Sequence, residues 1–141
     1  SSGEVWVREG VYRGTSSPLL ALQRDVAVYG GFAGNESSRD QRNSAGRATI
    51  LDGEDRRCCV IGADHAVLDG FVVTRGKNGM EHTSGSSVVA NCLFLRNSAN
   101  NGTGGGMYIR DSAPQIHDSI FSGNAAYRDG GGYIVTTHHL W

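Results

Sequence analysis

Short apolar runs alternate with polar and glycine-rich stretches along nearly the whole chain. Residues 5–7 and 26–32 are examples, since both runs are rich in β-branched and aromatic residues. Such runs are typical of β-strands, and none has the length and helical period of an amphipathic helix. The sequence of residues 19–22 is compatible with a strand and with one helical turn. The pattern therefore predicts an all-β protein.

Two stretches in the C-terminal half of the chain follow nearly the same pattern. Asn97 lies three residues after Phe94, and Asn124 lies three residues after Phe121. A single unit of this size, built from short strands, cannot bury its own apolar face. The repeat therefore predicts β coils stacked about 4.8 Å apart, each covering the next.

Stacking of this kind places equivalent side chains above one another as ladders. Phe71 precedes Phe94 by 23 residues, and Phe94 precedes Phe121 by 27 residues. We therefore expect Phe71, Phe94 and Phe121 to form one aromatic ladder, with Phe32 as a candidate fourth member.

A second ladder is expected from Asn97 and Asn124, with Thr74 at the equivalent position one coil earlier. Stacked asparagines can satisfy one another's amide groups at a turn, where asparagine also tolerates left-handed geometry. A glycine triplet follows each repeat unit, at 104–106 and 130–132. These triplets predict corners where the backbone bends sharply or approaches another segment closely.

Three stretches depart from the strand pattern. Residues 33–48 and 76–87 are polar and without periodicity, so we expect two loops that project from the stack. Residues 136–141 replace the expected start of another repeat, and they are compatible with a cap on the last coil and equally with an accidental truncation.

The repeat residues also carry a family resemblance. Phe94-Leu-Arg-Asn97 and Phe121-Ser-Gly-Asn124, with the glycine triplets, resemble the F-x-x-N and G-G-x repeats of right-handed parallel β-helix proteins. The same residues are similar to those of pectin-lyase-like bacterial surface proteins of the polymorphic outer membrane protein type. The resemblance implies one domain over residues 1–141, a single-stranded right-handed parallel β-helix (solenoid) of five or six coils. It also implies a secreted or cell-surface bacterial protein.

Composition excludes several other classes of protein. The formal net charge is −1 and the arginines are scattered, so no basic stripe for nucleic acid is present. No apolar run approaches the roughly 20 residues of a membrane span. The odd number of cysteines argues against a disulfide framework, and Cys92 is expected to be a core thiol. The chain starts at Ser1 without a basic-then-apolar leader, which we interpret as a segment of a longer repeat protein.

Enzymes of the β-helix family that act on polysaccharides use clustered aspartates, or Ca²⁺ with an arginine or lysine base. Asp52 and Asp69 both occur in Leu-Asp-Gly, and Asp55 lies close by in the sequence. If Asp52 and Asp69 were neighbours on consecutive coils, their carboxylates would suit glycoside hydrolysis or would hold Ca²⁺. The same Asp-Gly pairs are also common turn formers. No zinc signature or other cofactor motif is present, so no further cofactor is expected.

A binding role requires exposed aromatic and polar side chains on a rigid scaffold. The candidates are two sets: polar residues of the two predicted loops, and tyrosines that follow the glycine triplets. They are Arg39, Asp40, Arg42, Lys77, Tyr108 and Tyr133. The expected ligand is a polysaccharide or a host-surface glycan.

Three functions follow in order from these observations. The first is a secreted or cell-surface module with a structural or adhesive role that binds glycans through residues 33–48 and 76–87. The second is a polysaccharide-active hydrolase or lyase that uses the acids around Asp52 and Asp69. The third is self-association through the open ends of the stack.

Overall fold

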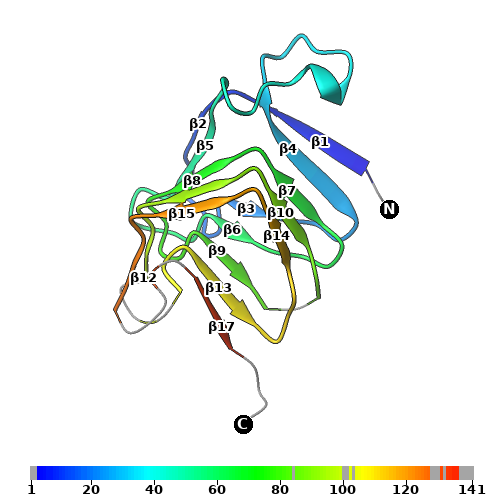
Figure 1. Ribbon diagram of the computed structural model, residues 1–141. Helices are drawn as coiled ribbons and strands as arrows, with labels where there is room; N and C mark the ends of the chain where they lie inside the picture. Colours follow the sequence, from blue (N-terminus) through cyan, green and yellow to red (C-terminus); the bar gives the residue numbers. More distant parts are fainter. Residues whose placement is uncertain are drawn as a thin grey trace.

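The computed structural model describes residues 3–83, 85–99, 102, 104–127 and 131, together with the backbone of 133–136. In this part of the chain the regular elements are β-strands, apart from one short 3₁₀ helix, η1 (Arg39–Gln41). The strands form three five-stranded sheets and one two-stranded sheet, and every strand pair is parallel (Figure 1). The predicted all-β class is confirmed.

The three large sheets are called A, B and C here, and their strands follow in spatial order. Sheet A contains β1 (Gly3–Arg8), β4 (Val26–Phe32), β7 (Val67–Asp69), β10 (Val88–Ala90) and β14 (Gln115–His117). Sheet B contains β2 (Gly10–Tyr12), β5 (Thr49–Asp52), β8 (Val72–Thr74), β11 (Leu93–Leu95) and β15 (Ile120–Ser122). Sheet C contains β3 (Leu20–Ala21), β6 (Val60–Ile61), β9 (Met80–His82), β13 (Met107–Arg110) and β17 (Tyr133–Thr136). The two-stranded sheet pairs β12 (Ser98–Ala99) with β16 (Ala125–Ala126).

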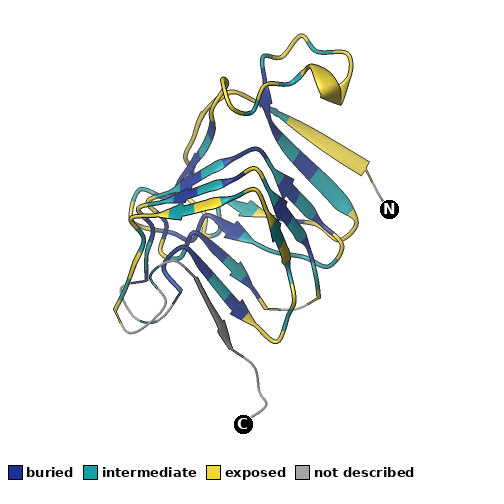
Figure 2. Ribbon diagram, viewed as in Figure 1, coloured by how far each residue is buried: buried dark blue, intermediate teal, exposed yellow. Residues whose placement is uncertain are grey.

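The chain passes through sheets A, B and C in this order five times, and one such passage is called a circuit. Each strand pairs with the equivalent strand of the next circuit, so neighbours in a sheet are never consecutive in the sequence. The three sheets enclose a common interior (Figure 1), and Figure 2 shows buried residues, in dark blue, on strands of all three sheets.

The corners between sheets are made by single residues with a left-handed backbone. Asp69, Ala90 and His117 end equivalent strands of sheet A, and the residue after each has a positive φ. In sheet B, the residue that follows the last paired residue of three strands also has a positive φ. The two sets are Gly70, Asn91 and Asp118, then Arg75, Arg96 and Gly123. Glycine, asparagine and aspartate tolerate this conformation best, whereas the two arginines adopt it at a cost of about 1 kcal/mol or more each.

The core consists of columns of inward-facing side chains that continue from one circuit to the next. Each column joins residues that are paired in register in one sheet, and their side chains are buried. The columns through circuits 2 to 4 are Val28, Leu68 and Val89 in sheet A, Leu51, Val73 and Phe94 in sheet B, and Val60, Met80 and Met107 in sheet C. Each such side chain contributes about 1.5–3 kcal/mol when it is fully removed from water.

The predicted aromatic ladder is confirmed for two of its members. Phe94 pairs with Phe121, and their rings stack with centroids 4.7 Å apart. Phe71 is not in this ladder, because Phe94 pairs on its other side with Val73, which follows Phe71 at the second position. Phe71 lies instead on the corner before β8, where its carbonyl oxygen accepts a hydrogen bond from the Leu93 N–H. Phe32 stacks on Trp6 and is also outside the ladder.

The predicted asparagine ladder is confirmed for Asn97 and Asn124. Asn97 is fully buried, and its backbone N–H and Nδ2 both donate to Asn124 Oδ1, at 2.9 and 3.0 Å. Asn97 Nδ2 also donates to the Val73 carbonyl oxygen, and its Oδ1 accepts the Gly76 N–H. The equivalent position one circuit earlier is therefore Gly76 rather than Thr74, which pairs with Leu95.

The structure agrees with one of the two predicted loops and differs from the other. Residues 33–48 do connect β4 to β5 without a strand, and they include η1. The prediction for residues 76–87 is wrong, because β9 lies in the middle of this stretch and the side chains of Met80 and His82 are fully buried. A short strand with a glutamate and a histidine gives no recognisable alternation. Residues 137–141 lie outside the described part of the chain.

We expect Asn97→Ala to lower the free energy of unfolding by about 2–3 kcal/mol, because the Gly76 N–H and the Val73 carbonyl would remain buried without partners. Urea denaturation followed by circular dichroism measures the change. Asn35→Ala, at an exposed position of the β4–β5 loop, is the control and should stay within about 0.5 kcal/mol of the parent. Equal stability of the two variants would show that the hydrogen bonds of Asn97 do not contribute to the free energy of unfolding as expected.

Candidate functional site

A row of outward-facing residues crosses the first three circuits of sheet A. Trp6 pairs with Tyr29, and Tyr29 pairs with Asp69. Val5 and Val7 lie on the opposite face of β1, where they line the interior. Because successive side chains of a strand alternate between faces, Trp6 and its register partners lie on the outer face.

Trp6 forms a flat aromatic surface on this face. One side of the indole stacks on the buried Phe32 ring, with centroids 4.8 Å apart and an interplanar angle of 5°. Trp6 nevertheless remains 40% exposed. The indole Nε1–H donates to Glu4 Oε1 at 2.9 Å, which orients the ring. The arrangement therefore holds an aromatic ring rigidly with a large part of its surface in water.

Two arginines of the β4–β5 loop lie over the neighbouring Tyr29. The Arg39 guanidinium lies 4.5 Å from the centroid of the Tyr29 ring and donates to its hydroxyl oxygen at 2.9 Å. Arg39 also donates to Glu4 Oε2 at 2.7 Å. The Arg42 guanidinium lies 5.1 Å from the same ring. These contacts hold the loop against β1 and β4, beside which Figure 1 shows it.

The loop itself is organised by hydrogen bonds to two of its side chains. The Glu36 carboxylate accepts the N–H groups of Ala33, Gly34 and Asn35, which lower the pKa of Glu36. Gln41 Oε1 accepts the N–H groups of Ser37 and Ser38 at the start of η1. These hydrogen bonds fix the backbone of residues 33–48. Arg39 and Arg42 therefore have defined positions over Tyr29.

Asp69 joins this loop to the third and fourth circuits. Its Oδ1 accepts hydrogen bonds from Arg42 Nη2 at 2.7 Å and from Asn91 Nδ2 at 3.1 Å. Arg42 Nη1 also donates to the carbonyl oxygens of Gly30 and Asp69. Asp69 is therefore neutralised by an arginine and positions the loop.

Asp52 lies in a different environment at the end of a sheet B strand. It accepts hydrogen bonds from Arg75 Nε and Nη2 at 2.9 and 2.6 Å and from Arg13 Nε at 2.9 Å. The paired Arg75 is the main reason why the pKa of Asp52 is lowered to about 2. Asp52 pairs with Thr74 and not with Asp69, so the condition that the two carboxylates are neighbours on consecutive coils is not met. The cause is that one Leu-Asp-Gly ends a strand of sheet B and the other ends a strand of sheet A.

The remaining predicted site residues are dispersed. Asp55 is exposed on the turn after β5, and Lys77 is exposed between β8 and β9. Asp40 is exposed in η1, and Tyr108 is half-buried in sheet C. None of these four lies in the row formed by Trp6, Tyr29 and Asp69. The side chain of Tyr133 lies outside the described part; its backbone pairs with Met107, one position away from Tyr108, which pairs with Ile134.

Trp6 and Tyr29 are among the aromatic residues that the sequence offers for a binding surface, together with Tyr12, Tyr108, Tyr127 and Tyr133, but the sequence does not select them from this set. The alternation Val5-Trp6-Val7 carries a signal for Trp6, since two inward valines place the tryptophan outward. Glu4 is not indicated by the sequence at all. Its partners come from β1 and from the distant β4–β5 loop.

The described residues give little support to metal binding or to thiolate chemistry. They contain no group of three or more histidine, cysteine, aspartate or glutamate side chains placed to hold a metal ion. Cys58, Cys59 and Cys92 are free and buried, as expected for Cys92, and burial raises the pKa of each thiol to about 12. Thiolate chemistry near neutral pH is therefore unfavourable at these cysteines. No helix in the described residues is long and apolar enough to cross a membrane.

No protein-family model, curated protein or solved structure matches this chain.

We expect Asp52→Asn to lower the free energy of unfolding by about 1–2 kcal/mol at pH 7, a value reduced from the full pKa shift because Arg13 and Arg75 are about half exposed. The folded pKa of about 2 lies below the usual 3.8, so the stabilisation is complete above about pH 4. It is lost as the pH falls toward 2. Urea denaturation at several pH values should therefore show the two proteins converging in acid.

Asp40→Asn serves as the matched control, since Asp40 is an exposed aspartate of η1. Its stability should follow that of the parent protein at every pH. A difference between parent and Asp52→Asn that is the same at pH 2 and pH 7 would show that the ion pairs of Asp52 are not its source.

Proposed function

We propose that the chain is a single-stranded, right-handed parallel β-helix of five coils. The parallel pairing in all three sheets and the unchanged order of sheets A, B and C support this assignment. The right hand is inferred from the general rule that parallel strands of one sheet are joined by right-handed crossovers. The F-x-x-N repeats resemble those of β-helix proteins and are consistent with it.

The proposed function is that of a secreted or cell-surface module, structural or adhesive, that binds a glycan on the outer face of sheet A. The observation that carries the proposal is the exposed side of Trp6, held rigid by Phe32 and Glu4. The C–H side of a sugar ring buries apolar surface against such an indole, which drives association. The secreted or surface location rests on the resemblance to bacterial surface proteins.

Polar groups around the indole supply the directional contacts that a sugar requires. Glu4, Arg39 and the Tyr29 hydroxyl lie beside Trp6 and exchange hydrogen bonds with one another. Carboxylates accept hydrogen bonds from sugar hydroxyls and guanidinium groups donate to them. Since the groups are held by each other before a ligand arrives, little side-chain entropy is lost on binding.

The enzymatic alternative has weaker support. Two carboxylates that act together as acid and base must lie on opposite sides of one scissile bond. Asp52 and Asp69 belong to different sheets; Asp52 is paired with two arginines and Asp69 with one. The lowered pKa of Asp52 also opposes a role as a proton donor near neutral pH.

We expect Trp6→Ala to weaken glycan binding by about 30-fold, because truncation of a central aromatic residue in a binding surface costs about 2 kcal/mol or more. The measurement is affinity electrophoresis and calorimetry against a panel of neutral and uronic-acid polysaccharides. Trp6→Phe keeps an aromatic ring and should retain most of the affinity. Release of reducing or unsaturated ends, assayed in parallel, would favour the enzymatic alternative.

Tyr127→Ala is the control for the loss of an exposed aromatic side chain. Tyr127 is 77% exposed in the last circuit, away from the row on sheet A. Its loss should leave binding unchanged. If no polysaccharide in the panel binds the parent protein, or if Trp6→Ala binds as well as the parent, the site is not a glycan site.

A further inference from the structure

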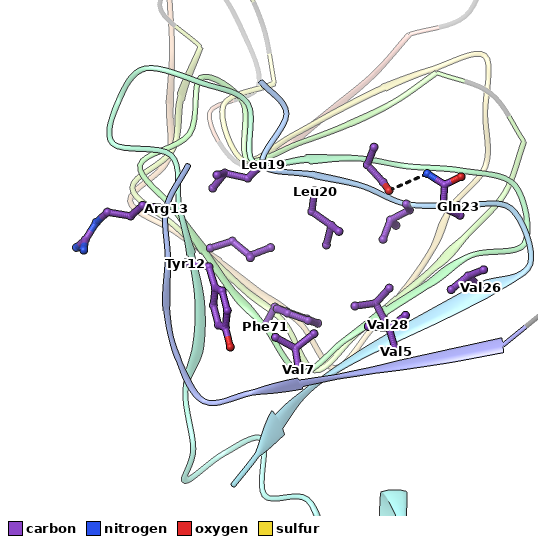
Figure 3. A pocket seen from close by; sticks show the side chains of 13 residues that line it. Val5, Val7, Tyr12, Arg13, Leu19, Leu20, Gln23, Val26, Val28 and Phe71 are labelled. Carbon is purple, nitrogen blue, oxygen red and sulfur yellow. Dashed lines mark hydrogen bonds between the residues drawn. The ribbon is translucent and has the colours of Figure 1, made fainter. Parts of the chain in front are cut away.

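The interior of the stack is largely apolar, so a buried polar group without a partner stands out. Figure 3 shows a cavity of about 350 Å³ in the first circuit, lined mainly by apolar side chains such as Val5, Val28 and Phe71. In the described residues, two buried side-chain atoms that can form hydrogen bonds have no partner: His82 Nε2 and Ser87 Oγ. They lie at the two ends of the connection between β9 of sheet C and β10 of sheet A.

His82 is held in one tautomer by Ser112 of the next circuit. The Ser112 hydroxyl donates to the His82 carbonyl oxygen at 2.8 Å, and its oxygen lies 2.9 Å from His82 Nδ1. Because the single hydroxyl proton is used on the carbonyl, Nδ1 carries the ring proton and donates to Ser112 Oγ. His82 is therefore a neutral imidazole, and its Nε2 is an acceptor that receives no hydrogen bond from the described residues.

The site of His82 is built for the neutral ring. The side chain is fully buried, and the ring packs directly on Gly62 of the second circuit. A Cβ atom at Gly62 would lie 2.9 Å from Nε2 and would clash with Cδ2. A proton on Nε2 would create a buried donor and a positive charge, with no acceptor to receive them. This burial lowers the pKa of His82.

The second circuit contributes one charged group that acts on His82. Asp64 favours the imidazolium, but its effect is smaller than that of burial. Asp64 Oδ1 is also engaged by the Ser86 N–H at 2.9 Å. His65, the titratable neighbour of Asp64, is exposed and lies beside the Asp64 carboxylate. The acid at this corner therefore does not supply the missing partner of Nε2.

The charged groups of the third and fourth circuits do not supply it either. Glu81 precedes His82 in β9, so its side chain lies on the opposite, outer face of the strand. Burial raises the pKa of Glu81, so uptake of a proton by Glu81 favours the folded state as the pH falls. In the fourth circuit Arg110 Nε lies 3.7 Å from Asp111 Oδ2, so these two charges pair with each other.

We propose that the contact of His82 with Ser112 is an acid-sensitive switch that joins the third and fourth circuits at neutral pH and releases them in acid. Uptake of one proton turns the ring toward water, where Nε2–H finds an acceptor. This movement breaks both contacts with Ser112 and loosens the corner between sheets C and A. His82 is the one fully buried histidine of the described residues, so the other corners do not respond in this way.

The direction of the pH dependence follows from the two states of the chain. The unfolded chain takes up the proton at the ordinary histidine pKa of 6.5, and the folded protein takes it up only at a lower pH. Stability is therefore complete well above pH 6.5 and is lost as the pH falls below it. The range differs from that of Asp52, whose ion pairs persist down to about pH 4.

The first test compares His82→Gln with the parent by urea denaturation at several pH values. Between about pH 7.5 and pH 5.5, the unfolding equilibrium constant of the parent should rise about tenfold more than that of His82→Gln, the limit for one proton. His117→Gln removes an exposed histidine of β14 and should keep the pH dependence of the parent. Parallel pH dependence of the parent and His82→Gln would overturn the proposal.

The second test is an NMR titration of the parent protein, which does not depend on the folding of a variant. At neutral pH the ring of His82 should show the ¹⁵N shifts of the tautomer with a proton on Nδ1. The Ala113 N–H donates to the Gly85 carbonyl oxygen at 3.2 Å across the same corner. Its resonance should change in the pH range in which His82 takes up a proton.

Two results of this titration would also overturn the proposal. A proton on Nε2 of the folded protein at neutral pH would show that the ring already has an acceptor. Protonation of His82 without a change at Ala113 would show that the charged ring stays in place and that the corner does not respond.

Discussion

The continuous register between successive circuits controls how this fold buries its core. Each inward side chain is covered only by the equivalent side chain of the next circuit, so a shift of register would uncover the core of every circuit beyond it. The Asn97–Asn124 contacts and the Phe94–Phe121 stack maintain the register where the chain turns. Corner residues with positive φ recur at equivalent positions, so the path of one circuit repeats in the next.

A core built in this way leaves the outer faces free to differ. The β4–β5 loop, residues 33–48, projects at one corner without altering the pairing of β4 with β7 or of β5 with β8. Glu36 and Gln41 organise the loop, and Arg42 attaches it to Asp69. The proposed glycan site on Trp6 thus belongs to a surface that the core supports but does not determine.

Arginine is the residue that joins the corners of this fold. Arg13 and Arg75 both bind the buried Asp52, which brings the first, second and third circuits together at one point. Arg42 bridges a carboxylate and two backbone carbonyl oxygens. A planar guanidinium offers several donors in fixed directions, whereas an ammonium group is a single point charge. Arginine therefore suits corners where a carboxylate and backbone carbonyls must be bound together.

Local alternation and an evident repeat were sufficient to predict the all-β class, the strand Val26–Phe32 and the loop 33–48. They were also sufficient to predict the equivalence of Phe94 with Phe121 and of Asn97 with Asn124. The three-dimensional pairing of strands was needed to place Phe71 and Thr74 outside these ladders, to identify residues 80–82 as a buried strand, and to assign Asp52 and Asp69 to different sheets. Local patterns do not reveal these features because circuits differ in length at their corners. The pairing of equivalent residues is then set by which side chains pack on each other in three dimensions. It cannot be predicted from the number of residues between them in the sequence. The grouping of Trp6, Tyr29 and Glu4 with Arg39 depends on the same register.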